Sequence, residues 1–385
     1  MTSETIYLDH AATTPVRAEV REAMAPYYEG RWGNPSSTHR WGREARAALE
    51  ESRERVADAL GAARSEILFT SGGTEADNLA LLGRWRVAGG GVACSAIEHS
   101  AVLDAARMAA RAGARVQILG VDARGVVDLA ALDEALHEQP AVVSVMWGNN
   151  EVGTLQPVEA IADRCRAAGV VFHSDAVQAF GRVPVRVDET PVDMVSVSSH
   201  KIGGPKGVGA LFVRSGVQLE PLLWGGGQER DLRPGTQNVA GAVALATAAE
   251  LATQEREAES ARQAALRDRL EAGLASQVPG LSVNAGGAPR VPHVLNVAIP
   301  SVDQDMLLAA LDLEGVAVSG GSACHSGAAE PSHVLVAMGR AADGAASIRF
   351  SLGRTTTDGE IERALDLVPR VVARLRERSD GSGIP

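Results

Sequence analysis

The chain has 385 residues, of which 45% are hydrophobic and 22% are charged, and its formal net charge is −11. This composition is typical of a globular protein with two or three domains. The acidic balance argues against a nucleic-acid-binding surface, although it leaves room for a local basic patch.

The sequence also limits the compartments that we expect. No apolar run reaches the ~18 residues that a membrane span requires. The first residues lack the basic and apolar regions of a signal peptide, so we expect a cytoplasmic protein without a membrane partner. Cys94, Cys165 and Cys324 are too few for a disulfide framework, which agrees with a reducing compartment.

The predicted elements begin with about forty mostly irregular residues that contain one short helical piece. Strand-like and helix-like segments then alternate, with short connections, as far as Ser198. This alternation predicts an α/β fold with a mostly parallel sheet and helices on both of its faces. The expected strands are Ile67–Thr70, Val92–Ala96, Arg115–Leu119, Ala141–Met146, Val170–Ser174 and Val192–Ser198. The expected helices are Arg43–Leu60, two that begin near Thr74 and Ser100, Leu129–His137 and Val158–Ala168.

A long Ala/Glu/Arg-rich helix is expected from Asn238 to about Leu274, and helices of this kind commonly join two domains. The segments after it predict a smaller α+β domain. They are the strands His293–Ile299, Val316–Ser319 and Ser347–Ser351 and the helices Gln304–Leu313 and Asp358–Arg374. We therefore divide the chain into a large domain, residues 13–255, and a small domain made of residues 1–12 and 256–385.

Lys201 stands at the end of an expected strand, just before a run of glycine and proline residues. Most lysines are solvated surface charges. This one follows a strand and two hydrogen-bonding residues, and the glycines after it let the backbone approach a ligand closely. The pattern indicates an amine that is presented to an aldehyde.

Other expected strands also end in polar residues. Ser71–Glu75 is a glycine-rich turn that opens a helix, which suits either a phosphate site or a plain turn capped by Thr74. Asp175 ends a buried strand, where it either caps a helix or keeps a heterocyclic nitrogen protonated. The segments around His99 and Asn150 follow two more strands. Open α/β sheets bind ligands at this edge, so we expect these groups to meet there.

Two features of the second half carry further chemistry. Cys324 lies among glycine, serine and histidine residues, which favours an exposed thiol over a structural one. At an unperturbed pKa near 8.5, only a few per cent of that thiol is thiolate at neutral pH. Arg349 alternates with Ile348 and Phe350 along a strand, so it points away from their face and either grips a carboxylate or forms a structural salt bridge.

Nine motifs together resemble the cysteine desulfurases, which are pyridoxal-phosphate enzymes of fold type I in the class V aminotransferase group. The resemblance covers nearly the whole chain, in order, and it is nearest to the subgroup with a longer cysteine loop that serves iron–sulfur cluster assembly and tRNA thiolation. The motifs are Tyr7–Pro15, Ser71–Glu75, Glu98–Ser100, Asn149–Gly153, His173–Gln178, Ser198–Gly207, Gly225–Asn238, Ser319–Gly327 and Arg349–Arg354.

This resemblance implies a set of roles for the binding residues. Lys201 would hold pyridoxal 5'-phosphate covalently, Asp175 would pair with its ring nitrogen, Gln178 would hydrogen-bond its phenolic oxygen and His99 would stack on its ring. The phosphate and the substrate carboxylate would each have their own set of residues. Thr74, Ser198 and His200 would bind the phosphate together with Thr236 of a second subunit, and Asn150 and Arg349 would bind the carboxylate of L-cysteine.

The implied reaction converts L-cysteine to L-alanine and leaves a persulfide on Cys324. Lys201 would move the Cα proton, and His99 is the candidate proton donor. The resemblance further implies a homodimer that passes sulfur to an acceptor or cluster-scaffold protein. The alternatives are a selenocysteine lyase, a related class V aminotransferase in which Cys324 is incidental, and an inactive scaffold for assembly partners.

Overall fold

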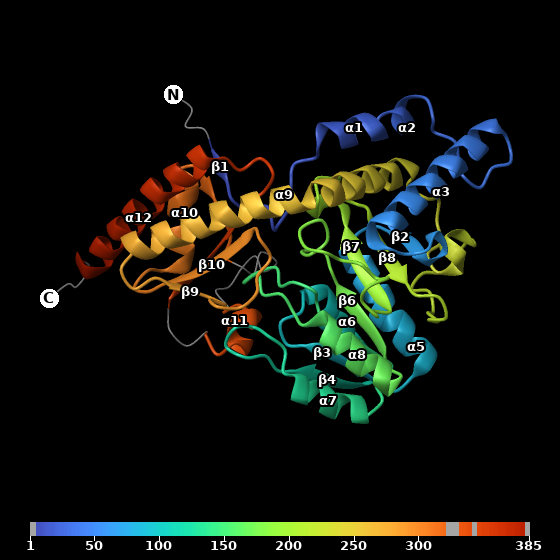
Figure 1. Cartoon of the computed structure of the whole chain (residues 1–385), viewed down its shortest axis with the longest axis horizontal. Helices are drawn as coiled ribbons and strands as arrows, with labels where there is room; N and C mark the ends of the chain where they lie inside the picture. The colour runs from blue at the N-terminus through green and yellow to red at the C-terminus, as the bar shows by residue number, and fades with distance from the viewer. Residues whose placement is uncertain (1–4, 321–330, 341–344, 382–385) are drawn as a thin grey trace.

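The computed structural model describes residues 5–320, 331–340 and 345–381 (Figure 1). Its main sheet has seven strands: β2 (Ile67–Thr70), β3 (Gly91–Ser95), β4 (Arg115–Leu119), β5 (Val142–Ser144), β6 (Val171–Asp175), β7 (Met194–Ser198) and β8 (Gly209–Val213). They lie in the order β2-β8-β7-β6-β5-β3-β4. Only β8 runs against the direction of the other strands of this sheet, so their carboxyl ends share one edge.

Helices cover both faces of this sheet because the strand residues alternate between two apolar cores. Ile67 and Phe69 of β2 belong to one core, whereas Leu68 belongs to the other. The first core includes α3 (Arg40–Leu60), α7 (Leu129–His137), α8 (Val158–Ala168) and the first part of α9 (Val239–Gln277). The opposite face carries α4 (Gly73–Asn78), the π-helical turn η2 (Leu79–Gly83), α5 (Arg84–Ala88) and α6 (Ser100–Arg111).

A separate apolar core lies around a smaller antiparallel sheet, at the left of Figure 1. Its strands are β9 (Ser282–Val283), β10 (Val294–Ile299) and β12 (Ala346–Ser351), in the order β12-β10-β9. α10 (Gln304–Leu313), α12 (Asp358–Gly381) and the second part of α9 pack on it. α9 therefore passes from one core to the other, and it is continuous through residue 255, where we divide the chain. That division stays a prediction.

The N-terminal segment links the same two parts. β1 (Ile6–Tyr7) pairs in parallel with β11 (Val316–Ala317), beside the small sheet. The chain then crosses to α1 (Ala18–Met24) and α2 (Pro26–Glu29), which lie along α9 at the top of Figure 1. The remaining elements are α11 (His333–Ala337) and the short turns η1 (Arg64–Glu66), η3 (Ser199–Lys201) and η4 (Gln228–Asp231).

The structure confirms the predicted α/β class and the mostly parallel sheet. Strand β8, which the sequence analysis did not anticipate, is the exception to the parallel arrangement. Cys94 and Cys165 are buried free thiols. Within the described ranges, no helix combines the length and the apolar character that a membrane crossing would need.

Candidate active site

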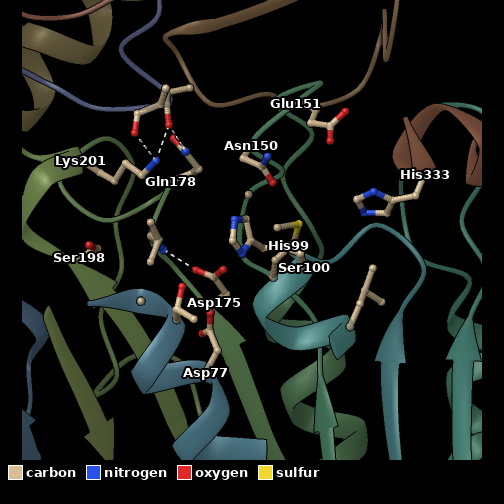
Figure 2. Close-up of a pocket in the computed structure, with 18 of the residues that line it drawn as sticks. Asp77, His99, Ser100, Asn150, Glu151, Asp175, Gln178, Ser198, Lys201 and His333 are labelled. Atoms are coloured by element: carbon tan, nitrogen blue, oxygen red, sulfur yellow. Dashed lines mark hydrogen bonds between the residues drawn. The ribbon is translucent and has the colours of Figure 1, made fainter. Parts of the chain in front are cut away.

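A cavity of about 540 Å³, here called the main cavity, lies at the carboxyl edge of the large sheet (Figure 2). Segments that follow β2, β3, β5, β6 and β7 line it, as expected for an open α/β sheet. Arg349 of β12, the turn Pro331–His333 and the carbonyls of Ala11 and Ala12 close its other sides. The main cavity is thus built from both parts of the chain.

Lys201 enters the main cavity from η3, the turn that directly follows β7. Its Nζ donates hydrogen bonds to the carbonyl oxygens of Ala11, at 2.6 Å, and Ala12, at 2.8 Å. Burial, together with the guanidinium groups of Arg349 and Arg182, lowers the pKa of Lys201 to about 8. The amine is therefore held in place, and a sizeable fraction of it is neutral near physiological pH.

Asp175 ends β6 on the floor of the main cavity, as Figure 2 shows. Its Oδ1 accepts a hydrogen bond from the backbone N–H of Val177 at 2.8 Å. No helix begins between β6 and β7, where every residue is described, so the alternative that Asp175 caps a helix is wrong, and this hydrogen bond stabilises a turn. Burial raises the pKa of Asp175, and the nearby His99 and Lys201 act in the opposite direction. A carboxylate in this position gains stability from a protonated nitrogen placed in the cavity.

Gln178 follows Asp175 and connects the site to the N-terminal segment. Its Nε2 donates to the carbonyl of Ala11 at 2.9 Å, and its Oε1 lies 3.2 Å from Nε2 of His293. The same carbonyl accepts from Lys201, so the predicted cofactor residues Gln178 and Lys201 share one backbone anchor.

The turn between β2 and α4 forms a cradle of small residues. Gly72 has a φ of 155°, and a Cβ added at Gly73 would lie 2.9 Å from Cγ2 of Val177. Thr74 lies in the first turn of the helix, where backbone N–H groups have no partner within the helix. Gly72, with no side-chain cap, precedes the helix, so Thr74 is not its cap. The buried Ser198 lies across this turn and also lines the cavity.

His200 and Thr236 occupy different surroundings. His200 lines the main cavity, its Nδ1 lies 3.2 Å from Oγ1 of Thr13, and burial lowers its pKa to about 4. Thr236 is exposed and is not among the lining residues. The single chain thus brings together the predicted phosphate residues except Thr236, the one that we assigned to a second subunit.

The two ring nitrogens of His99 have different roles. Its Nδ1 accepts a hydrogen bond from the N–H of Ala101 at 3.1 Å and so caps α6. The proton of the neutral ring is therefore on Nε2. Burial lowers the pKa of His99, with Lys201 and His333 adding to the effect. Figure 2 shows the ring between Asp175 and Asn150.

The neighbouring residues Asn149 and Asn150 have different surroundings. Asn149 is buried, and its Oδ1 accepts from the N–H groups of Glu151 and Val152 at 2.8 and 2.9 Å. Asn150 instead lines the main cavity. Arg349 donates to the carbonyl of Asn150 at 2.9 Å and to Oδ1 of Asp9 at 2.8 Å, while its buried Nε has no partner in the described part of the chain. The predicted carboxylate clamp therefore already contains one structural ion pair.

Two further carboxyl groups are buried close to Asp175. Burial and the neighbouring Asp175 raise the pKa of Asp77 well above its ordinary value. Burial raises the pKa of Glu98 to about 8, although Ser95 and the N–H of Met146 donate to it. Burial thus disfavours the charged form of both groups. Asp77 lines the main cavity together with Asp175, whereas Glu98 does not.

His173, which shares a strand face with Asp175, does not line the main cavity. Its Nδ1 lies 2.8 Å from Oγ of Ser144, and its Nε2 lies 2.9 Å from Oγ of Ser196. Burial lowers its pKa to about 3, so the ring is neutral. His173 supports the strands beneath the site.

The sequence analysis missed one side of the main cavity. His333 and Ser332 line it, Nε2 of His333 lies 2.9 Å from the carbonyl of Glu98, and Ser332 donates to Glu151. The signal that could have found them is Pro331-Ser332 before an apolar run, since Ser332 caps α11. Cys324 and His325 lie outside the described residues.

The residues present fit pyridoxal phosphate. The main cavity offers an amine for an aldehyde, a buried carboxylate for a ring nitrogen, and a small-residue cradle with free N–H groups for a phosphate. A Cβ at Gly209 would lie 2.8 Å from Cα of Gly72, so the cradle itself depends on close backbone packing.

Comparisons with known proteins agree with this chemistry. The aminotransferase class-V family matches residues 6–364. The cysteine desulfurase IscS of Dictyoglomus turgidum is 43% identical over 375 residues, which is 96% of this chain and 95% of the relative. A solved NifS-like protein superposes with a TM-score of 0.90 at 37% identity and covers 96% of this chain and 100% of its own. The structure of SspA in complex with cysteine matches with a TM-score of 0.79 at 35% identity and covers 90% of this chain and 99% of its own.

Proposed function

The chain belongs to the aminotransferase class-V family and to the cysteine desulfurases within it, and we propose that its main cavity takes sulfur from L-cysteine with the residues described above. The fold is accordingly fold type I, and the enzyme class depends on pyridoxal 5'-phosphate. The observation that carries the proposal is the convergence of Lys201, Asp175 and His99 on one cavity.

We assign the cofactor to a set of residues that surrounds Lys201. Asp175 would hold the ring nitrogen, Gln178 the phenolic oxygen and His99 the ring face. Thr74, Ser198 and His200 would bind the phosphate, with Thr236 of a second subunit. When bound, the cofactor supplies an aldehyde that joins the substrate amine and a ring that withdraws electrons from its Cα.

Lys201 and His99 would share the proton transfers. With its pKa lowered to about 8, Lys201 is basic enough to accept the Cα proton and is neutral often enough to do so. The Nε2–H of His99 is available because the other ring nitrogen is used in capping. Hydrogen bonds to both groups fix their positions, which serves proton transfer.

The substrate carboxylate would bind at Arg349 and Asn150. Arg349 is buried and lines the main cavity, and its Nε has no partner among the described residues. Asn150 lines the same cavity, and its carbonyl accepts from Arg349. The ion pair with Asp9 helps to hold the guanidinium group in place. A carboxylate placed there orients the rest of the amino acid toward Lys201.

Cys324 would receive the sulfur. Its thiolate forms a bond to the substrate sulfur, the Cβ–S bond of the substrate breaks, and the carbon takes a proton to become L-alanine. The thiol of the enzyme becomes a persulfide, so no external oxidant is required. Cys324 would then pass the sulfur to an acceptor or cluster-scaffold protein for iron–sulfur assembly or tRNA thiolation, in a cytoplasmic homodimer.

Two other functions share the cofactor and are separated by their products. A selenocysteine lyase would act on selenocysteine in preference to cysteine. An aminotransferase would need a keto-acid acceptor and would release a keto acid in place of L-alanine. The buried Asp175 and the low pKa of Lys201 have no purpose in an inactive scaffold, which argues against that alternative.

Mass spectrometry of the holoenzyme after reaction with L-cysteine tests the assignment. We expect one added sulfur atom on the peptide that contains Cys324, together with stoichiometric L-alanine. Cys324→Ser should keep the visible absorbance of the bound cofactor and lose the added sulfur, and Cys165→Ser is the control that should lose neither. Normal L-alanine production by Cys324→Ser would disprove the role of this cysteine.

A further inference from the structure

A second cavity, of about 280 Å³, lies behind Lys201 and is separate from the main cavity. It forms where the N-terminal segment, α9 and the segment Gly353–Thr355 meet. Among the residues that the structure describes, Lys201 alone lines both cavities. Apart from Lys201, the residues that line the second cavity have no part in the reaction proposed above.

Two buried guanidinium groups line this second cavity, and each has a nitrogen atom without a hydrogen-bond partner among the described residues. Arg17 and Arg182 are 7% and 8% exposed, and Nη1 of each has no hydrogen-bond partner among the described residues. Arg17 is paired through its Nη2 with Glu255. For Arg182, the described residues offer no ion pair, and burial lowers its pKa to about 10, which leaves it charged at neutral pH. A buried charge in this state favours a counter-ion strongly.

A buried acceptor lies on the same wall. Gln263 is 4% exposed, and its Nε2 donates to Oε1 of Glu259 at 2.7 Å. Its Oε1 has no partner in the part of the chain that the structure describes. An occupant that accepts from Arg182 and donates to Gln263 would satisfy both groups, and buried polar groups are rarely left without partners.

The charges around the second cavity set the charge of that occupant. Five cationic side chains line it, and none of them belongs to α9: Arg17, Arg21, Arg182, Lys201 and Arg354. Glu255 and Glu259 supply the carboxylates. The excess of cations attracts an anion, and the two carboxylates offset part of that excess.

We propose that the second cavity binds a small monocarboxylate, with its carboxylate on Arg182 and Arg17. Two guanidinium groups suit the two oxygens of a carboxylate. The volume of the second cavity admits a molecule of a few heavy atoms. The Oε1 of Gln263 would accept a hydrogen bond from a hydroxyl or an ammonium group of the same molecule.

A carboxylate bound in the second cavity would change the pKa of Lys201 without entering the main cavity. The guanidinium of Arg182 is one of the groups that lower the pKa of Lys201. A carboxylate on Arg182 offsets part of that effect, and the pKa of the Lys201 amine then rises. The second cavity is thus placed to couple the level of a small acid to the basicity of Lys201.

Calorimetric titration of the holoenzyme with sodium acetate, at constant ionic strength, tests the site. Arg182→Met should weaken acetate binding at this site by about tenfold or more, the size expected for one lost charge-assisted hydrogen bond. Arg21→Met removes the same charge from an exposed lining residue and should weaken it by less than about threefold. Both variants keep Arg349, so any acetate in the main cavity contributes equally to each titration.

A crystal of the wild-type holoenzyme soaked in sodium bromide gives a test that needs no variant. We expect an anomalous peak beside Arg182 that acetate displaces. Unchanged acetate binding in a folded Arg182→Met protein would overturn the proposal, as would water alone beside Arg182. Tighter binding of inorganic phosphate than of acetate at Arg182 would also overturn it, because it would show a dianion site.

Discussion

The pKa of Lys201 depends on its surroundings in the folded chain, and these cannot be seen from its position in the sequence. Two backbone carbonyls hold the ammonium, while burial and two guanidinium groups disfavour its charge. The carbonyls belong to the N-terminal segment, about 190 residues earlier in the chain. The sequence could indicate a held amine, but it could not indicate what holds it.

The rate at which the apo protein takes up pyridoxal phosphate should report the pKa of Lys201. Only the neutral amine attacks an aldehyde, so the rate should rise with pH and level off above about 8, where Lys201 has lost its proton. Stopped-flow absorbance across a pH series measures this. A rate that keeps rising toward pH 10 would show an ordinary lysine. Arg182→Met, which removes one of the cations near Lys201, should move the midpoint to higher pH.

Asp175 and Asp77 provide a matched pair of buried carboxyl groups. Asp175→Asn removes the carboxylate that would pair with the ring nitrogen of the cofactor, and we expect turnover to fall by about 10²-fold or more, as for other lost electrostatic groups. Asp77→Asn should cost less than about tenfold, because burial and the neighbouring Asp175 raise the pKa of Asp77 well above its ordinary value and so disfavour its charge. Steady-state rates at saturating pyridoxal phosphate measure both, and equal losses would contradict the assignment.

His99 and Asn149 show why the sequence leaves some roles open. By residue type alone, His99 suits a structural or a chemical role. In the structure, its Nδ1 caps α6 and its side chain also lines the main cavity. Two neighbouring asparagines are equivalent by residue type, and only the burial of Asn149 separates them. His333 was missed because its approach to Glu98 is a contact across 235 residues.

At the scale of elements, the best predictions were those with strong local signals. The bounds of β2, β4, α7, α8 and α10 agree with the structure, since periodicity and turn residues define them. Strand β8 was missed because it follows the glycine-rich run after Lys201. β9 has two residues and α11 has five, so neither is long enough to show a period.

Gly209 connects element packing to the cradle for phosphate. It pairs with Thr70 of β2 and with Ser198 of β7, and a Cβ there would lie 2.6 Å from the carbonyl of Val197. Gly209→Ala should therefore lower the free energy of unfolding by about 1–3 kcal/mol and weaken pyridoxal phosphate binding.

Gly120→Ala is the control for this change, because a Cβ at Gly120 would have no atom within 4 Å. Its free energy of unfolding should change by less than about 0.5 kcal/mol. Urea denaturation and equilibrium titration with pyridoxal phosphate measure the two effects. Equal behaviour of the two variants would show that the close packing at Gly209 does not matter for the cradle.

At the scale of the molecule, the main cavity depends on the way the chain joins its two cores. α9 contributes Leu245 to the core of the large sheet and Leu270 to the core of the small one. Asp175 ends β6 of the large sheet and Lys201 lies in η3, directly after β7, whereas Arg349 lies in β12 of the small sheet. The sequence could predict both parts and the helix between them, but the contact of Arg349 with Asp9 and Asn150 arises only from their packing.

The dimer is the remaining expectation at this scale, and Thr236 makes it testable. Thr236 is exposed and does not line the main cavity of its own chain, which is what a residue that serves a partner's cavity requires. Alone, Thr236→Ala should weaken pyridoxal phosphate binding by about tenfold, the loss expected for a hydrogen bond to a charged group. Lys201→Ala should abolish turnover.

Mixed dimers of these two variants separate a contribution within one chain from a contribution across the interface. A subunit with Thr236→Ala keeps Lys201, and its Lys201→Ala partner keeps Thr236. If Thr236 acts across the interface, one cavity of the mixed dimer has both residues, and half of its cavities should bind pyridoxal phosphate with wild-type affinity. If Thr236 acts within its own chain, both cavities are defective and the affinity stays that of Thr236→Ala. Titration of purified mixed dimers, with sedimentation to establish their size, distinguishes the two results, and a monomer that binds the cofactor normally would contradict the assignment.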